Sequence, residues 1–369
     1  MSSTNNNLVT SVMGGVLRTV STNGLRLIIN LFYKDDFMIG RKKIFSAIFQ
    51  KNPRRNFSLL SKNKNKFVAF ILSPLMLYLM FWLLLPMIFA IILSLYDYSA
   101  RRVGGSFLGL GGNNPFIGLG NYLALFEDTR NAQQFQISLR NTVLFSFLVL
   151  PLNLLINIPL ALAIDSVTER VKPIYRFIYF LPTVTAAVGV AIMWKYLYHP
   201  TQGLFNMILS GLGLQTVVWL GNTKAIILGV PLSMWSTIIT YLWQDFGFNL
   251  IIFIAALQGI CREYREAASV DGANNWQIFW KITLPQLQPT ILFVCVTTMI
   301  SSFQIFDLIW VMTEGGPMSQ TRVLVMDIYM NAFRSGQMGY AGAEAIVLFL
   351  LVLVVTLFQM RLMRNRMEA

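Results

Sequence analysis

Long apolar runs constrain the fold of this chain more than any other feature, and the first of them, residues 67–96, carries no charged side chain. A helix needs about 20 apolar residues to cross the roughly 30 Å hydrocarbon core of a bilayer. Six segments meet that requirement, at residues 67–96, 141–164, 177–194, 231–257, 289–311 and 340–360. Prolines inside these segments do not exclude spanning helices, because neighbouring helices satisfy the freed backbone groups. They predict kinks at Pro74, Pro86, Pro151, Pro159 and Pro182.

The composition places most of the chain in lipid. The mean hydropathy is +0.59, and 55% of the residues are hydrophobic while only 12% are charged, which lies outside the range of soluble domains. We therefore predict an all-α integral membrane protein in which residues 67–369 form one six-span domain behind a basic leader, residues 1–66. The length of that leader favours a true first span over a cleaved signal peptide, whose apolar region lies near the start.

The positive charge is concentrated in the leader. The net charge is +13, and residues 1–66 hold twelve Lys or Arg against only Asp35 and Asp36. With the leader inside, twenty-one of the 29 basic residues lie on the inner side, so the positive-inside rule predicts that both termini are cytoplasmic. The leader is either an amphipathic helix on the inner leaflet or a tether. Nucleic-acid binding is not expected, because no recognition module accompanies the charge.

The sequence lacks the patterns of an enzyme or a metal protein. Neither Cys261 nor Cys295 is placed to form an external disulfide, and His199 is the one histidine, so a zinc site is not expected. No Gly-x-x-x-x-Gly-Lys-Ser/Thr sequence is present, which means that this chain does not hydrolyse ATP through a P-loop of its own. No Ser/His/Asp, metal or carboxylate constellation shares one predicted face. We predict no catalytic residue, no bound metal and no cofactor on this chain.

The loop between the fourth and fifth apolar runs, residues 258–288, carries the most specific motif. Its members are Glu266, Ala267, Ala268, Gly272, Ile282, Leu284 and Pro285. Residues 263–270 are compatible with a short helix whose two small alanines allow close approach, and Gly272 supplies a permissive turn. We expect Asn275 to cap a second helix and Pro285 to open the next apolar segment.

Several flanking motifs lie at the ends of the predicted spans. They are Gly118-Leu119-Gly120-Asn121-Tyr122, Asn141-Thr142, the segment from Arg176 to Pro182, Phe306-Asp307, and Thr313-Glu314-Gly315-Gly316-Pro317. Each alone is explained by a helix cap, a kink or a tight turn. Together with the loop, they resemble the permeases of ATP-binding-cassette (ABC) importers, in the branch related to the maltose and glycerol-phosphate permeases. The resemblance runs from about residue 67 to the C-terminus.

This resemblance implies the type I ABC importer permease fold, with a cytoplasmic coupling helix in the loop. It implies that Glu266 pairs with a basic group of an ATPase subunit. The alternative is that Glu266 is a solvated surface charge near the start of a helix, without a partner. One departure concerns the helix entry: the family usually has Ile-Pro before this helix, and this chain has Ile260-Cys261. The exact start of the coupling helix therefore stays open.

The function that the resemblance implies is that of a permease subunit in an ATP-driven carbohydrate importer of the bacterial cytoplasmic membrane. The implied partners are a second permease subunit, two ATPase subunits that hold ATP and Mg, an external solute-binding protein, the sugar itself and membrane lipid. The sequence does not say which sugar is carried, since selection can reside in the external binding protein.

Substrate-binding residues follow from the family's maltose-contact positions, carried across without gaps. They are Gln244, Asp245 and Phe248 in the fourth span and Thr298, Ser302 and Ile305 in the fifth. The last three recur at helical spacing on one face, which either lines a pore or packs against a neighbouring helix. Asp245 lies near the middle of a helix expected from Pro231 to Gly259, and such a carboxylate faces protein or water rather than lipid.

A rival class is a secondary transporter or channel driven by an ion gradient. Asp245, Asp307 and Glu344 lie at apparent membrane depth and are the residues that would form a proton or cation path.

Overall fold

The computed structural model describes residues 67–102 and 113–367 and is largely helical. The chain divides into two compact units, Met1–Leu84 and Leu85–Ala369. The predictions for the leader, residues 1–66, lie outside the described residues.

The first described helix begins at Phe67 and contains a π-helical segment, η1 (Met80–Leu84), before it continues as α4 (Leu85–Ser94). Pro86 lies two residues after the end of this segment. Because proline has no N–H to donate to the carbonyl four residues back, a wide turn at this point accommodates the missing hydrogen bond.

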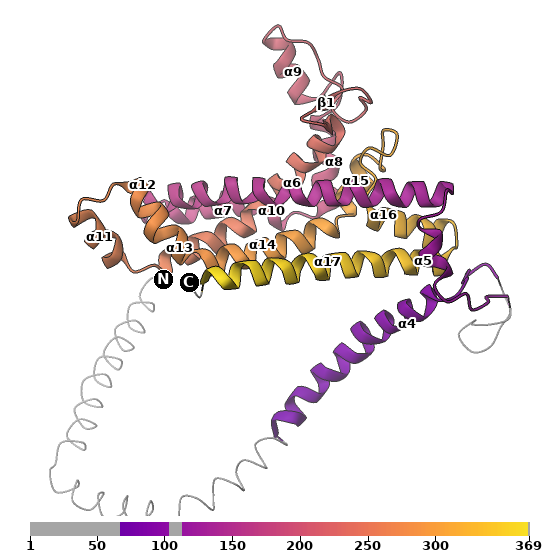
Figure 1. Ribbon diagram of the computed structural model, residues 1–369. Coiled ribbons are helices and arrows are strands. Elements are labelled where there is room, and N and C mark those ends of the chain that lie inside the picture. The colour runs from indigo at the N-terminus through magenta and orange to yellow at the C-terminus, as the bar shows by residue number, and fades with distance from the viewer. Residues whose placement is uncertain (1–66, 103–112, 368–369) are drawn as a thin grey trace, which may run out of the picture. The chain divides into compact units, whose positions relative to one another are not determined.

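The rest of the second unit is built from helices with one short hairpin (Figure 1). The helices that precede the hairpin are α5 (Gly120–Ala124), α6 (Arg130–Ser166), α7 (Lys172–Val184), α8 (Ala187–Leu197) and α9 (Leu204–Gly211). The hairpin pairs β1 (Ile226–Ile227) with β2 (Val230–Pro231) in antiparallel fashion. The later helices are α10 (Leu232–Gly259), α11 (Arg262–Val270), α12 (Asn275–Ile278), η3 (Phe279–Thr283), α13 (Leu284–Gln286), α14 (Gln288–Phe303), α15 (Asp307–Met312), α16 (Leu324–Tyr329), η4 (Met330–Arg334) and α17 (Met338–Met367).

Four helices in the described part of the chain are long and apolar enough to cross a membrane. They are Phe67–Ser94, Arg130–Ser166, Leu232–Gly259 and Met338–Met363. Two bent pairs also pass when each is counted as one span: α7 with α8, bent by 96°, and Asn275–Gln286 with α14, bent by 65°. The number of spans is therefore four to six, which includes the six that the apolar runs predict.

The third predicted span, residues 177–194, is broken two residues after Pro182, where a kink was predicted. α7 ends at Val184, and Thr185 and Ala186 adopt extended backbone before α8 begins. The break is tolerated because α10 satisfies it: the Gln244 Nε2 group donates to the Thr185 carbonyl at 3.2 Å, and the Thr183 hydroxyl donates to the Gln244 carbonyl at 2.9 Å. Irregular backbone inside a membrane protein needs such partners.

The prediction of a helical fifth span over residues 289–311 was wrong at its far end. α14 ends at Phe303, and Phe306 has φ −141° and ψ −63°, outside helical values. Ile305 therefore lies between α14 and α15 and not on the helix face that carries Thr298 and Ser302. The break contains neither Gly nor Pro, which are the strongest local signals of a helix end.

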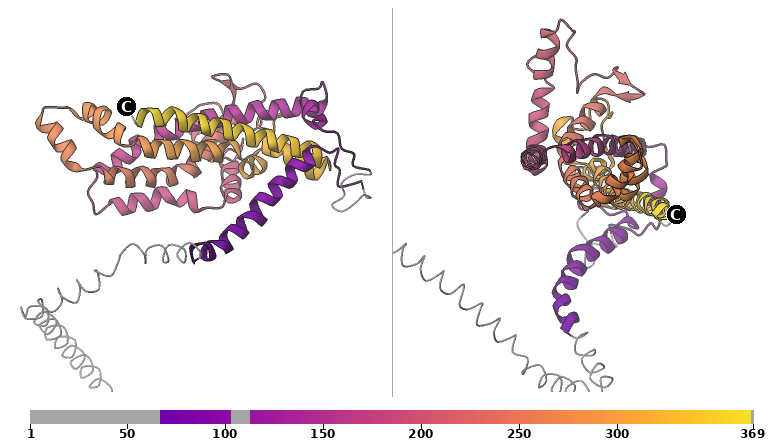
Figure 2. Two further views of the ribbon diagram at one scale, coloured as in Figure 1. Left: turned by 60° about the horizontal axis from the view of Figure 1, so that its bottom comes forward. Right: turned by 90° about the vertical axis from the view of Figure 1, so that its left-hand side faces the viewer.

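α10 lies in the middle of the packing, against α6 and α7, while α14 packs between α6 and α17, and α17 packs against α4. Close approach is visible at Gly247 of α10, where an added Cβ would collide with the carbonyl oxygen of Tyr179 in α7. α11 and α12 lie at one end of the bundle and α5 at the other, and α8 and α9 project from its side (Figures 1 and 2). We call these the α11 end and the α5 end.

Candidate functional site

The loop at the α11 end folds as a helix closed by a specific backbone turn. The predicted short helix is confirmed as α11, Arg262–Val270, with Cys261 in extended backbone as its N-cap. Gly272 has φ +80°, its N–H donates to the Ser269 carbonyl at 3.1 Å, and the Ala273 N–H donates to the Ala268 carbonyl at 2.9 Å. This pair of bonds is a Schellman motif. An added Cβ at Gly272 would meet nothing within 4 Å, so the left-handed backbone conformation, and not space, is what requires glycine.

The second helix of the loop begins one residue earlier than predicted. Asn274, and not Asn275, is the cap of α12: its side chain accepts from the Gln277 N–H at 2.8 Å, and the Gln277 side chain accepts from the Asn274 N–H at 2.9 Å. The reason is the capping box, which needs Gln or Glu three residues after the cap. Asn275 has Ile278 at that position.

Three motif residues come together although they lie far apart in the loop. Ala268, Gly272 and Ile282 line one small cavity of about 290 Å³. Leu284 is half-buried and Pro285 is exposed, both in α13. The motif thus shapes the inner side of the loop, where α11 folds back on the segment that leads into α14.

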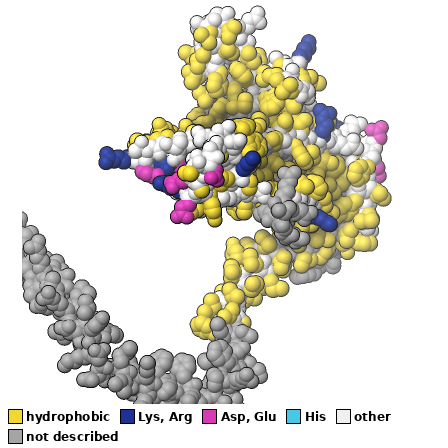
Figure 3. Space-filling view, turned by 60° about the vertical axis from the view of Figure 1, so that its left-hand side comes forward, with side chains coloured by type: hydrophobic (Ala, Val, Ile, Leu, Met, Phe, Trp, Pro, Cys, Tyr) yellow, Lys and Arg dark blue, Asp and Glu magenta, His cyan; other side chains and the backbone are white. Residues whose placement is uncertain are grey.

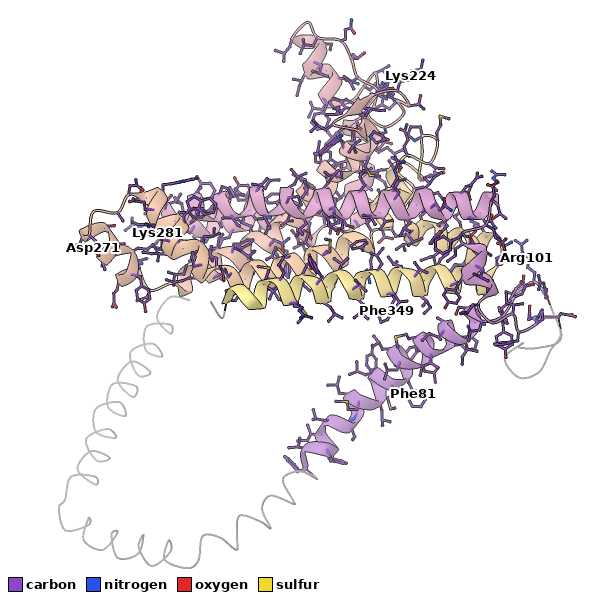
Figure 4. All side chains as sticks on the ribbon, viewed as in Figure 1. Phe81, Arg101, Lys224, Asp271, Lys281 and Phe349 are labelled. Atoms are coloured by element: carbon purple, nitrogen blue, oxygen red, sulfur yellow. The ribbon has the colours of Figure 1, made fainter. Side chains whose placement is uncertain are left out.

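The outer side of the loop is exposed and mixes acidic groups with large apolar side chains. Glu266 and Ala267 are exposed and Ala268 is half-buried. Val270 is 87% exposed and Trp276 is 68% exposed. Charged side chains gather around this end of the bundle (Figure 3), and Asp271 and Lys281 lie there in Figure 4. An exposed surface of this kind is typical of a contact with another protein.

The predicted substrate residues fall into two groups, and Asp245 belongs to a polar network between three helices. Its Oδ2 accepts from the Asn153 amide of α6 at 2.9 Å and from the Asn249 amide of α10 at 2.8 Å. The same Asn249 amide lies 3.3 Å from the Thr298 hydroxyl of α14. Asp245 is at the middle of α10, as predicted, although Pro231 is the N-cap and not the first helical residue.

The other four predicted substrate residues do not join this network. Gln244 bonds to Thr185 at the α7–α8 break, and Phe248 is 45% exposed. Ser302 is fully buried and its hydroxyl donates to the Met299 carbonyl at 3.0 Å, while Ile305 is buried in an apolar cluster. The role of these residues toward a substrate stays a prediction.

Sequence reasoning missed Asn153, Asn157 and Asn249, which are all buried. The Asn157 amide donates to the Asn153 side-chain oxygen at 2.9 Å and so extends the network along α6. A signal was present: asparagine inside an apolar span is costly unless it finds a partner in the bundle interior.

At the α5 end, two of the flanking motifs hold loops in place. The Asn121 amide donates to the carbonyls of Ser94 and Tyr96, each at 2.8 Å, and so fixes the end of α4. The Asn141 amide donates to the carbonyls of Ser319 and Arg322, at 2.8 and 3.0 Å. These asparagines fasten the loops that surround the predicted spans.

The three acidic residues of the rival ion path lie in separate surroundings. Asp307 is exposed at the start of α15, and Glu344 is buried in α17, where it accepts from the Asn331 amide at 2.9 Å. Within the described ranges, no hydrogen bond joins either of them to Asp245. No group of three or more His, Cys, Asp or Glu that could hold a metal was found among the described residues.

Comparison with known proteins decides the family. Residues 57–368 match the family described as the binding-protein-dependent transport system inner membrane component. The chain belongs to this family. It is a membrane permease subunit of an ABC transporter, and such permeases are not enzymes.

Relatives of the permease support the same assignment along most of their length. A probable ABC transporter permease of Bacillus subtilis, YurN, is 31% identical over 83% of this chain and 99% of the relative. The trehalose/maltose transport system permease MalF of Thermococcus litoralis is 33% identical over 69% of this chain and 82% of the relative. A crystal structure of a bacterial alginate ABC transporter in complex with an alginate pentasaccharide-bound periplasmic protein includes a chain with a TM-score of 0.70 and 25% identity, covering 84% of this chain and 99% of that one.

Proposed function

We propose that this permease imports a carbohydrate or a similar polyhydroxylated solute through the bacterial cytoplasmic membrane, with both termini on the cytoplasmic side. It works with a second permease subunit, two ATPase subunits that hold ATP and Mg, and an external solute-binding protein. The maltose permease relative and the fold shared with the alginate importer support the substrate class. The excess of Lys and Arg in the leader and in the connections on the same side supports the orientation.

The observation that carries the ATPase contact is the exposed surface of α11. Glu266 projects from a short helix with exposed Ala267 beside it, and Val270 and Trp276 add apolar area at the rim. A carboxylate beside small residues matches a basic cleft on a partner, where Ala267 and Ala268 permit close packing. The Schellman turn at Gly272 holds the helix at a fixed angle to the rest of the loop.

Transport then follows from movement of α11 and requires no chemistry on the solute. When the ATPase subunits close on ATP, α11 moves with them and the helices behind it rock, which opens the central path outward. The external binding protein delivers the solute to that path. Product release reverses the movement.

The path is lined in part by the polar face of α10 and α14. Gln244 and Asp245 of α10 are half-buried, Ser301 in the last turn of α14 is exposed, and so is Gln304, the residue that follows α14. Polar side chains at such depth face protein or water and not lipid. We include Gln244, Asp245 and Phe248 in the substrate path, with Thr298, Ser302 and Ile305 behind or beside it.

Reconstitution tests the function. The permease is inserted into proteoliposomes together with its partner permease and ATPase subunits, and uptake of labelled oligosaccharides is measured with ATP inside and the binding protein outside. We expect uptake only when both ATP and the binding protein are present. Uptake by this chain alone under an ion gradient, without ATP, would instead support a secondary transporter.

A further inference from the structure

A cluster of charged side chains at the α11 end joins helices that are far apart in the sequence. Asp165, near the end of α6, is placed between two cations: its Oδ1 lies 3.5 Å from the Lys172 Nζ of α7, and its Oδ2 lies 3.4 Å from the Arg265 Nη1 of α11. One carboxylate therefore contacts both the next membrane helix and the helix that carries Glu266.

Glu169, in the connection between α6 and α7, repeats the arrangement. Its Oε1 accepts from the Lys172 Nζ at 2.8 Å and lies 3.7 Å from the Arg262 Nη2 of α11. The hydrogen bond from Lys172, with the charge of that ammonium group, lowers the pKa of the Glu169 carboxyl from its ordinary value. Glu169 is thus an anion at neutral pH, and two acids each connect Lys172 to an arginine of α11.

The positions of these charges are not explained by their own helices. Asp165 lies in the last turn of α6, where the helix dipole disfavours an anion, and Lys172 is the first residue of α7, where the dipole disfavours a cation. The Lys172 side chain is nonetheless only 4% exposed. The contacts of Lys172 with Asp165 and Glu169, and of Asp165 with Arg265 of α11, compensate for these unfavourable positions.

The same cluster reaches α10. The Arg265 Nη2 donates to the Leu257 carbonyl in the last turns of α10 at 3.4 Å. Asp165, Glu169, Lys172, Arg262 and Arg265 all line one cavity of about 710 Å³, together with Glu266. α6, α7, α10 and α11 therefore meet at a single polar junction beside the predicted ATPase contact.

We propose that Asp165 and Glu169 form an electrostatic joint that makes α11 and the α6–α7 connection move as one body. The proposal rests on the proposed function, in which α11 follows the ATPase subunits. Through the joint, displacement of α11 is passed to Lys172 at the start of α7, and hence to the broken pair α7 and α8 that packs against α10. Asp165 and Glu169 are positioning residues, since neither touches substrate or ATP.

Ion pairs suit such a joint better than apolar packing at this location. The Arg262–Glu169 pair is exposed and contributes little to folding stability, and the buried Lys172 ammonium group keeps Glu169 as a partner at 2.8 Å when Asp165 is neutralised, so the helices stay assembled. The ion pairs limit how far, and in which direction, α11 can move relative to the α6–α7 connection. The expected consequence of breaking them is a loss of coupling between ATP hydrolysis and uptake, with the complex intact.

The first experiment removes one of the two carboxylates that link Lys172 of α7 to α11. In the reconstituted full complex, Asp165→Asn is expected to lower solute uptake per ATP hydrolysed by about fivefold or more, the lower range of coupling factors between sites. Asp165→Glu should restore the ratio because it keeps the carboxylate. Asp271→Asn is the matched control: Asp271 is an exposed acid on the same loop and has no ion pair within the described residues. An unchanged ratio in Asp165→Asn, or the same loss in Asp271→Asn, would overturn the joint.

The second experiment joins the two elements covalently and does not depend on how well Asp165→Asn assembles. Cys261, which is exposed, is first replaced by serine, and Glu169→Cys is combined with Arg262→Cys. A short bismaleimide then links the two positions. If α11 and the α6–α7 connection move as one body, the cross-linked complex keeps its uptake within about twofold of the same variant before cross-linking, well short of the coupling loss above. Arrest of uptake by the cross-link would show relative movement and overturn the proposal.

Glu266→Lys in the same assay separates this inference from the function on which it rests. If Glu266→Lys abolishes uptake while Asp165→Asn and the cross-link behave like the controls, the ATPase contact stands and the joint is wrong. If Glu266→Lys leaves uptake unchanged, the docking of α11 fails, and the joint fails with it.

Discussion

The two ends of the bundle use polar residues in opposite ways. At the α5 end, the side chains of Asn121 and Asn141 are buried and each donates to two backbone carbonyls of this chain. At the α11 end, Glu266 is exposed on a helix none of whose residues is buried. Residues of the first kind are explained by contacts within the chain, whereas Glu266 has no such explanation.

This difference predicts different consequences of mutation. Removing a buried donor leaves its carbonyl partners without a hydrogen bond, which costs about 1–3 kcal/mol per group. Changing an exposed carboxylate leaves folding almost unaffected, so any loss of function must come from a partner. Variants at the two ends should therefore separate stability from coupling.

The largest effect is expected from Glu266→Lys, which should reduce uptake to background. The physical reason is that a lysine facing a basic cleft places two like charges in a desolvated contact. Membrane insertion should stay normal, because the residue is exposed in this chain. Transport and solute-stimulated ATPase activity of the reconstituted complex are the measurements.

The matched control for this change is Glu263→Lys, in the first turn of the same helix and also exposed. It carries the same charge reversal but lies outside the motif. Equal losses in both variants would point to net charge, and normal solute-stimulated ATPase activity in Glu266→Lys would contradict the docking contact.

Asn141→Ala should produce the next largest effect, on stability. It removes both bonds that hold the loop at Ser319 and Arg322, so we expect destabilisation of about 2 kcal/mol or more. Thermal unfolding of the complex in detergent, followed by the loss of monodisperse protein, measures it. Asn131→Ala is the control, since Asn131 bonds to Gln337 at an exposed site. A similar loss in both variants would remove the distinction between buried and exposed asparagines.

Much of this fold was predictable because a membrane-spanning helix needs a long apolar run, which is visible in the sequence. The six apolar runs lead to the helices that carry the spans, and the motif around Glu266 predicts α11 and its turn at Gly272. The kink predicted at Pro182 lies two residues before the break after Val184, whereas neither Gly nor Pro marks the break after Phe303. The contact that satisfies the backbone at the α7–α8 break, from Gln244 to the Thr185 carbonyl, is a tertiary contact and leaves no local pattern in the sequence.

The candidate site was predictable in position but not in its partners. Asp245 was expected to face protein or water and not lipid, and the amides of Asn153 and Asn249 are the groups that it contacts. Ile305 was assigned to a helix face that ends two residues earlier. The family's maltose-contact positions were transferred to this chain without gaps, which assumes that every helix ends at the same position. α14 ends before Ile305, so the assumption fails there.

Asp245→Asn tests whether the polar network around Asp245 stabilises the fold, as Asn141 does, or acts in transport, as is proposed for Glu266. The substitution keeps the size and an acceptor oxygen for the Asn153 and Asn249 amides but removes the charge. We expect altered uptake kinetics, by about threefold to tenfold, with normal complex yield and normal basal ATPase activity. Asp307→Asn, at an exposed position, is the control. Loss of assembly, or unchanged kinetics for every sugar tried, would assign Asp245 to structure alone.

Gly272→Ala should have a smaller effect and probes the geometry of the coupling loop. An L-residue held at φ +80° costs about 1–2 kcal/mol, and this shifts the end of α11 without disturbing the spans. We expect a partial loss of uptake with an unchanged unfolding temperature of the bundle. Gly259→Ala, at the helical end of α10 with open space around it, should be neutral. Equal activity in the two variants would mean that the Schellman turn does not set the docking angle.

The smallest effect is expected from deletion of residues 1–50. This deletion tests whether the surface that contacts the ATPase is confined to the α11 end or includes the leader. Arg54, Arg55, Lys62, Lys64 and Lys66 remain, and five basic residues directly before the first span are sufficient to fix its orientation. Transport by the truncated chain should therefore equal that of the full chain, with protease accessibility in spheroplasts reporting the orientation. A truncated chain that inserts correctly but does not assemble with its ATPase would extend the partner surface from α11 into the leader.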